Sequence, residues 1–149
     1  MSPRFHTLAI SDVRRETPDA VSIAFDVPDE LAEAYRYRPG QYLTVRAAID
    51  GEEVRRSYSI CSGLDEGELR IAVKRIDGGT FSTFANERLA AGMPIDVMTP
   101  SGRFVLPEAP EGRTYVAFAA GSGITPIMAQ AKTILAREPE SRFHLFYGN

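Results

Sequence analysis

The stretch Arg55-Arg56-Ser57-Tyr58-Ser59-Ile60 decides the interpretation of the fold. It follows a turn signal at Asp50-Gly51 and alternates in character, which predicts a β-strand. Alternation would place Arg56, Tyr58 and Ile60 on one face of that strand. A guanidinium and a phenol ring that point the same way can bind an anion and stack a flat ring, and a flavin dinucleotide offers both groups. On this stretch alone, an exposed strand face with arginine lying over tyrosine is the simpler interpretation.

Composition narrows the classes of protein to consider. The chain has 149 residues, a net charge of -3 and a pI near 5.4, which argues against a partner made of nucleic acid or a membrane surface. No apolar run reaches the roughly 18 residues of a membrane-spanning helix, and the N-terminus has no apolar signal region, so a cytoplasmic location is expected. The single cysteine, Cys61, excludes an internal disulfide and an iron–sulfur cluster held within this chain.

The first hundred residues are expected to form a small barrel. Around the central strand, alternation and turn signals predict strands at residues 5–14, 20–27, 41–49, 68–76 and 94–99. A short helical piece is expected at 30–35. A helix is expected at 80–91, closed by Gly92 as a left-handed cap. Six short strands with one helix between the fifth and sixth predict a mainly β, six-stranded antiparallel barrel.

The pattern changes after residue 106. Prolines mark a linker at 107–112, and 115–120 is a continuous apolar run, as expected of a strand buried on both faces of a parallel sheet. Thr125 is a candidate N-cap for a helix that runs to about Arg137, and 143–147 is a further strand. We therefore expect a barrel domain at 1–106 and, at 113–149, the first strand–helix–strand of a Rossmann-like nucleotide domain that is cut short.

Two glycine-containing loops are candidate phosphate sites. Gly78-Gly79-Thr80-Phe81-Ser82 opens the first helix, where unpaired amides and the helix dipole favour an anion. Gly121-Ser122-Gly123-Ile124-Thr125-Pro126 joins a strand to a helix, although it lacks the third glycine of the dinucleotide fingerprint. An ordinary capped helix at the first loop and a plain turn at the second remain open alternatives. No metal site and no acid–base pair are apparent.

Taken together and in order, these motifs resemble the ferredoxin–NADP reductase superfamily. The similar segments are Pro39-Gly40-Gln41-Tyr42, Arg56-Ser57-Tyr58-Ser59, Gly79-x-x-Ser82, Pro100-Ser101-Gly102-Arg103-Phe104, Gly121 to Pro126, and Tyr147-Gly148-Asn149. The resemblance covers almost the whole chain. Within the superfamily the chain is most similar to reductase components of the phenylacetyl-CoA epoxidase type.

The resemblance implies roles for individual residues. Arg56 would contact the flavin pyrophosphate, Tyr58 would stack on the isoalloxazine, and Ser59 would hydrogen-bond near flavin N5, which requires the strand to bend or end there. The remaining implied contacts are with the ribityl chain (Val73 and Lys74), the pyrophosphate (Gly79, Thr80 and Ser82) and the nicotinamide nucleotide (Gly121, Gly123 and Thr125). Tyr58, Ser59 and Thr125 would border the reacting atoms.

The resemblance also implies cofactors and partners. FAD and NAD(P)H would be the cofactors, with a 2Fe-2S cluster expected only in the full-length protein, and electrons would pass to a phenylacetyl-CoA oxygenase. A reductase of another oxygenase, and a non-catalytic flavin- or nucleotide-binding module, remain alternatives, and FMN remains a weaker rival to FAD. We expect this chain alone to hold flavin weakly and to be inactive, and the choice between NAD and NADP to be decided beyond Asn149.

Overall fold

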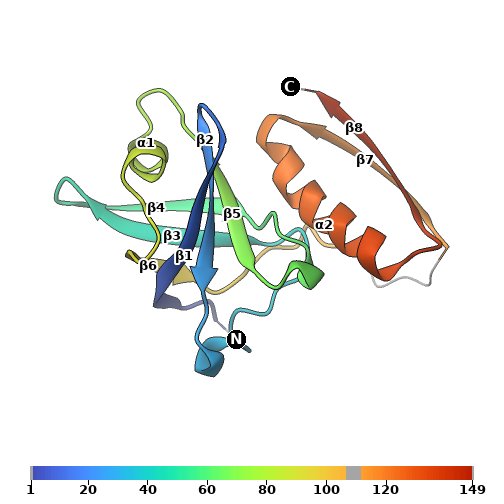
Figure 1. The fold of residues 1–149 in the computed structure, drawn as a ribbon, viewed down its shortest axis with the longest axis horizontal. Coiled ribbons are helices and arrows are strands. Elements are labelled where there is room, and N and C mark those ends of the chain that lie inside the picture. Colours follow the sequence, from blue (N-terminus) through green and yellow to red (C-terminus); the bar gives the residue numbers. More distant parts are fainter. Residues whose placement is uncertain (1, 107–111, 149) are drawn as a thin grey trace.

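The computed structural model describes residues 2–106 and 112–148, and its larger part is a six-stranded antiparallel sheet (Figure 1). The strands follow the spatial order β4-β3-β6-β1-β2-β5. Their bounds are β1 (Phe5–Thr17), β2 (Ala20–Asp26), β3 (Tyr42–Ile49), β4 (Glu52–Ser59), β5 (Leu69–Lys74) and β6 (Pro94–Met98). The sheet curls until its two edges approach, because Ile60, just after β4, forms a bridge with Ile71 in β5. The expected mainly β, barrel-like fold is confirmed.

Alternating apolar side chains fill the barrel. The core takes residues from every strand, and Leu43, Val45, Ile60, Ile71, Val73 and Val97 have no exposed surface. Helix α1 (Thr80–Glu87) packs on this core through Phe81 and Ala85. The central strand begins three residues earlier than expected, because its register with β3 starts at the hairpin turn, where Ile49 pairs with Glu52.

Two helical expectations were wrong in extent. Helix α1 ends at Glu87 rather than near residue 91, and Gly92 does not cap it. Gly92 has a positive φ of 91° and donates its N–H to Ile10 O at 2.7 Å, so it serves the turn that leads into β6. In place of the expected helical piece at 30–35, the structure has a single 3-10 turn, η1 (Asp29–Leu31), which overlaps only its first two residues.

A parallel strand pair forms the smaller part of the chain. It consists of β7 (Thr114–Ala120) and β8 (Arg142–Gly148), joined by the 3-10 turn η3 (Gly121–Gly123) and α2 (Ile124–Arg137). Helix α2 lies between this pair and the barrel (Figure 1). The far face of the pair exposes Phe118 and Phe146, whose rings stack at 5.1 Å. The expectation that β7 is buried on both faces was wrong for this chain, because only one face is covered.

The predicted linker at 107–112 lies, apart from Gly112, outside the described residues. Within residues 2–106 and 112–148, no helix is long and apolar enough to cross a lipid bilayer.

Candidate functional site

Strand β4 directs Arg56 and Tyr58 toward the inner side of the sheet at its edge. Arg56 pairs with Val45 and Tyr58 pairs with Leu43, and side chains of directly opposed residues share a face. Because Val45 and Leu43 belong to the core, Arg56 and Tyr58 lie on the core-facing side of β4, which is an edge strand of the sheet. The strand ends at Ser59, which still pairs in register with Tyr42.

Tyr58 is half-buried and Arg56 is exposed. The Tyr58 ring lies 5.8 Å from that of Phe81 at an interplanar angle of 37°, and burial raises the pKa of its phenol. The Arg56 guanidinium donates a hydrogen bond to Arg55 O at 2.7 Å and otherwise faces solvent. A flat apolar ring therefore lies beside an accessible positive charge.

The start of α1 is a turn built around two glycines. Gly78 has a positive φ of 75° and Gly79 is the N-cap residue, with no side chain capping the first amides. Ser82 Oγ accepts the Ile76 N–H at 3.0 Å, and Ser82 is only 4% exposed. A Cβ at Gly79 would lie 2.4 Å from that oxygen. The turn thus leaves little room for a side chain at 79, and Ser82 supports the turn from inside.

The Tyr58–Phe81 contact brings β4 and the first turn of α1 together. Phe81 follows Thr80, which is exposed beside the uncapped amides. Uncapped amides at a helix start are donors suited to phosphate. The structure therefore brings the Tyr58 ring close to the backbone donors of α1, and Arg56 lies two residues earlier on the same face of β4. A cation, an aromatic ring and backbone donors are the groups that a flavin nucleotide needs.

The two predicted residues of β5 lie differently from one another. The Val73 side chain is wholly buried in the core, so only its main chain could border a ligand, whereas Lys74 is exposed at the end of the strand. Sequence reasoning missed Asn86, which donates to Val73 O at 3.1 Å and Ser82 O at 2.9 Å and so ties α1 to β5. No pattern in the sequence indicated it, because the contact depends on the tertiary fold.

The second glycine loop follows the carboxyl end of β7. Gly121 has a positive φ of 55° and Gly123 is the N-cap of α2. Thr125 Oγ1 donates to Ser122 O at 2.9 Å, so the expectation that Thr125 caps the helix was wrong. A concavity of about 620 Å³ lies over the last residues of β7 and β8, and none of the glycine-loop residues Gly121, Gly123 and Thr125 is among the described residues that line it. Ligands of parallel α/β sheets bind at this edge.

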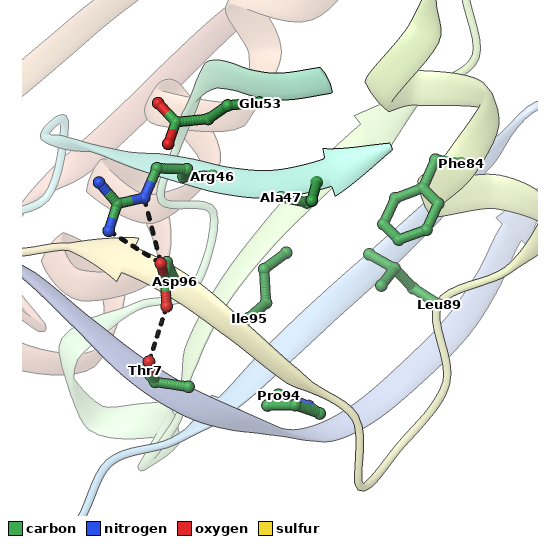
Figure 2. Close-up of a pocket in the computed structure, with 10 residues that line it drawn as sticks. Thr7, Arg46, Ala47, Glu53, Phe84, Leu89, Pro94, Ile95 and Asp96 are labelled. Atoms are coloured by element: carbon green, nitrogen blue, oxygen red, sulfur yellow. Dashed lines mark hydrogen bonds and ion pairs between the residues drawn. The ribbon is translucent and has the colours of Figure 1, made fainter. Parts of the chain in front are cut away.

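A separate hollow of about 370 Å³ lies between β1, β3, β6 and α1 (Figure 2). Its polar wall holds Arg46, which pairs with Asp96 at 2.8 Å, and Asp96 also accepts a hydrogen bond from Thr7. Its apolar wall includes Phe84 and Leu89. None of the predicted site residues is among the described residues that line it. Glu53 also lines the hollow and pairs with Arg55. Among the described residues that line it, the one cation, Arg46, is therefore already paired, and the hollow is poorly suited to a phosphate.

Two groups that could carry chemistry in other settings are structural here. His6 packs edge-on against Tyr35 at 5.7 Å. Cys61 is partly buried and its thiol donates to Arg70 O at 3.4 Å, and burial raises its pKa away from the reactive thiolate form.

Comparison with known proteins identifies a family for the barrel. A family model described as "Oxidoreductase FAD-binding domain" matches residues 7–106. A component of the 1,2-phenylacetyl-CoA epoxidase of Escherichia coli (strain K12) is 53% identical over 97% of this chain, which spans 41% of that protein.

Two solved structures extend the comparison. The ferredoxin NADP+ reductase of Neisseria gonorrhoeae with bound FAD and NADP matches with a TM-score of 0.78 at 25% identity, over 96% of this chain and 56% of that one. Phthalate dioxygenase reductase, described as a modular structure for electron transfer from pyridine nucleotides to 2Fe-2S, matches with a TM-score of 0.76 at 28% identity, over 96% and 43%. Because the family model covers more than half of its residues, the chain belongs to the FAD-binding domain family of oxidoreductases, of the ferredoxin–NADP reductase type.

Proposed function

We propose that this chain binds FAD in the opening between β4 and the start of α1, and that it belongs to a reductase that takes electrons from NAD(P)H. The observation that carries the proposal is the contact between Tyr58 on β4 and Phe81 in the first turn of α1, where the amides after Gly79 are uncapped. We propose that the exposed guanidinium of Arg56, on the same face of β4 as Tyr58, completes the site. Membership of the FAD-binding domain family supports the same assignment.

The residues present fit a flavin dinucleotide. Arg56 and the amides that follow Gly79 would hold the pyrophosphate, with Thr80 beside them and Ser82 shaping the turn. Tyr58 would carry the isoalloxazine on its ring face, and Ser59, at the end of β4, would donate to the flavin. Lys74 and the main chain of Val73 would border the ribityl chain. Two phosphate-binding elements suit FAD better than FMN, which has one phosphate.

The second glycine loop would receive the nicotinamide nucleotide. Gly121 and Gly123 let backbone approach a phosphate closely, and Thr125 lies at the start of α2, whose N-terminus favours an anion. FAD, when bound, would accept a hydride from NAD(P)H and release its two electrons singly. The chain's own contribution is to hold donor and acceptor rings within roughly 3–3.5 Å and to exclude water from between them.

The acceptor is proposed from the relatives. Similarity to the phenylacetyl-CoA epoxidase component favours an oxygenase acting on phenylacetyl-CoA, reached through a 2Fe-2S centre outside this chain. The match to phthalate dioxygenase reductase keeps a reductase of a different oxygenase as the second candidate. A purely regulatory flavin-binding module would show no electron transfer from NADH or NADPH to a dye. Complementing the phenylacetyl-CoA oxygenase with the full-length reductase would separate the two reductase candidates.

Binding of FAD, FMN and riboflavin tests the site directly. Flavin fluorescence titrations of the chain should give the order FAD, FMN, riboflavin from tightest to weakest, because each phosphate adds contacts at Arg56 or at α1. Riboflavin binding as tightly as FAD would contradict the assignment of Arg56 and the α1 amides to the pyrophosphate.

A further inference from the structure

The segment that follows β4 lies directly against α2. Gly63 and the 3-10 turn η2 (Leu64–Glu66) form a short surface, here called the 63–66 platform. The Leu64 amide donates to Thr133 Oγ1 at 3.1 Å. Two ion pairs flank this bond, Glu66 with Lys132 at 3.1 Å and Asp65 with Arg137 at 2.9 Å.

The platform is itself held firmly to the barrel. Tyr37 Oη donates to Ser62 O at 3.0 Å and to Gly63 O at 3.3 Å. The wholly buried Ser62 hydroxyl accepts the Arg70 amide at 3.1 Å, and a Glu66 oxygen accepts the Gly63 amide at 3.1 Å. The loop therefore has a fixed conformation before α2 is considered.

The approach of the two backbones is close. An added Cβ at Gly63 would lie 2.9 Å from the Lys132 Cβ and 3.4 Å from the Thr133 amide nitrogen. Ordinary carbon–carbon contacts lie at about 3.5–4.0 Å, so any larger residue at 63 must push α2 away by roughly 1 Å. Glycine is needed here for proximity and not for its backbone angles, since its φ is -75°.

This contact connects the two halves of the proposed site. Ser59, at the end of β4, is four residues before the platform. On α2, Thr125 precedes Lys132 by seven residues, which is roughly 10 Å along a rigid helix. A tilt of α2 at the platform therefore moves the loop at 121–125 relative to Tyr58 and Ser59.

We propose that the platform and its α2 partners are positioning residues that set the distance between the flavin strand and the nicotinamide loop. The consequence for hydride transfer rests on the function proposed above. Exposed ion pairs contribute little to stability, and the two pairs are partly exposed. Their value lies in fixing the orientation of α2, because two pairs and a hydrogen bond together restrain both its tilt and its rotation.

A distance measurement tests the proposal without any cofactor. Spin labels attached through Ser57→Cys on β4 and Ser122→Cys beside α2, in a Cys61→Ala background, report the separation by pulsed electron paramagnetic resonance. Asp65→Arg and Arg137→Asp should each broaden the distance distribution, and the double variant should narrow it again. Glu33→Arg is the matched control, because Glu33 pairs with Arg36 at 3.2 Å within the barrel. Distributions that are unchanged in both single variants would overturn the proposal.

A kinetic measurement on the FAD-loaded full-length protein, of which this chain is expected to be a part, tests the consequence. Gly63→Ala should slow flavin reduction by NADH or NADPH by about 10- to 100-fold, since a misplacement of about 1 Å can cost that much, while FAD affinity and the melting temperature stay near those of the parent. Equal rates in Gly63→Ala and the parent would contradict the positioning role. If the parent binds no FAD, the proposed function fails, and the distance measurement still decides on the platform.

Discussion

Replacing Gly79 with alanine adds one methyl group at the tightest point of the α1 turn. The φ of -73° suits any residue, so alanine introduces no backbone strain. Its Cβ would lie 2.4 Å from Ser82 Oγ and 3.0 Å from Ile76 O. Ser82 can relieve this contact only by turning its hydroxyl away from the Ile76 amide, which it accepts at 3.0 Å.

The cost follows from that lost hydrogen bond. A partly buried donor left unsatisfied costs about 1–3 kcal/mol, and the lower chain entropy of alanine in the unfolded state returns about 0.4–1 kcal/mol. The free energy of unfolding should therefore fall by about 1–2 kcal/mol. Because each kcal/mol corresponds to about 2–4 °C for a chain of this size, the melting temperature should fall by several degrees.

Urea unfolding of the cofactor-free chain measures this change, and a double-mutant cycle assigns its cause. Ser82→Ala removes the clashing oxygen, so Gly79→Ala should cost less in that background than in the parent. Gly123→Ala is the matched control, because Gly123 has a φ of -60° and an added Cβ would meet nothing within 4 Å. Additive effects of Gly79→Ala and Ser82→Ala would refute the proposed clash.

Three further predictions concern charge, pH and the aromatic contact. Arg56→Ala should weaken FAD binding by about 10- to 100-fold, as expected for a charged hydrogen bond of about 1.5–3 kcal/mol, while urea unfolding stays within about 0.5 kcal/mol of the parent because the side chain is exposed. Burial raises the pKa of Tyr35 to about 12, and its hydroxyl donates to Val97 O at 2.6 Å. The folded state thus holds this proton more tightly than the unfolded state, so about 2–3 kcal/mol of stability present below pH 10 should be lost as the pH rises to about 12. Urea unfolding midpoints over that pH range should fall less in a Tyr35→Phe chain than in the parent. An equal fall in both chains would exclude Tyr35 as the source. Tyr58→Ala should destabilise the cofactor-free chain through its lost packing on Phe81 and should also weaken riboflavin binding. Tyr58→Phe should bind riboflavin about as well as the parent. A Tyr58→Ala chain that binds riboflavin as tightly as the parent would exclude ring stacking.

Strand positions could be predicted because alternation reports burial directly. In β6, Ile95 and Val97 alternate with more exposed neighbours and are buried, and the hairpin at Asp50-Gly51 set the register of β4. Element ends were less accessible to sequence reasoning. Gly92 looks like a helix cap, yet it pairs with Ile10 in a neighbouring strand, and that contact exists only in the folded barrel.

In the candidate site, too, the features with a sequence motif could be predicted, and those that depend on tertiary contacts could not. Motif order indicated Arg56, Tyr58 and the α1 glycines, and the structure brings Tyr58 and the first turn of α1 together. Sequence reasoning missed the inward position of Ser82 and the tie through Asn86, because both depend on contacts between α1 and β5. These tertiary contacts leave no periodic signal in the chain.

The most direct test of the flavin assignment is a crystal structure of this chain with FAD. We expect the pyrophosphate to contact the Arg56 guanidinium and the amides that follow Gly79, with the isoalloxazine lying against the Tyr58 ring. Flavin bound instead in the hollow beside Arg46 and Asp96, or with its pyrophosphate away from α1, would contradict it.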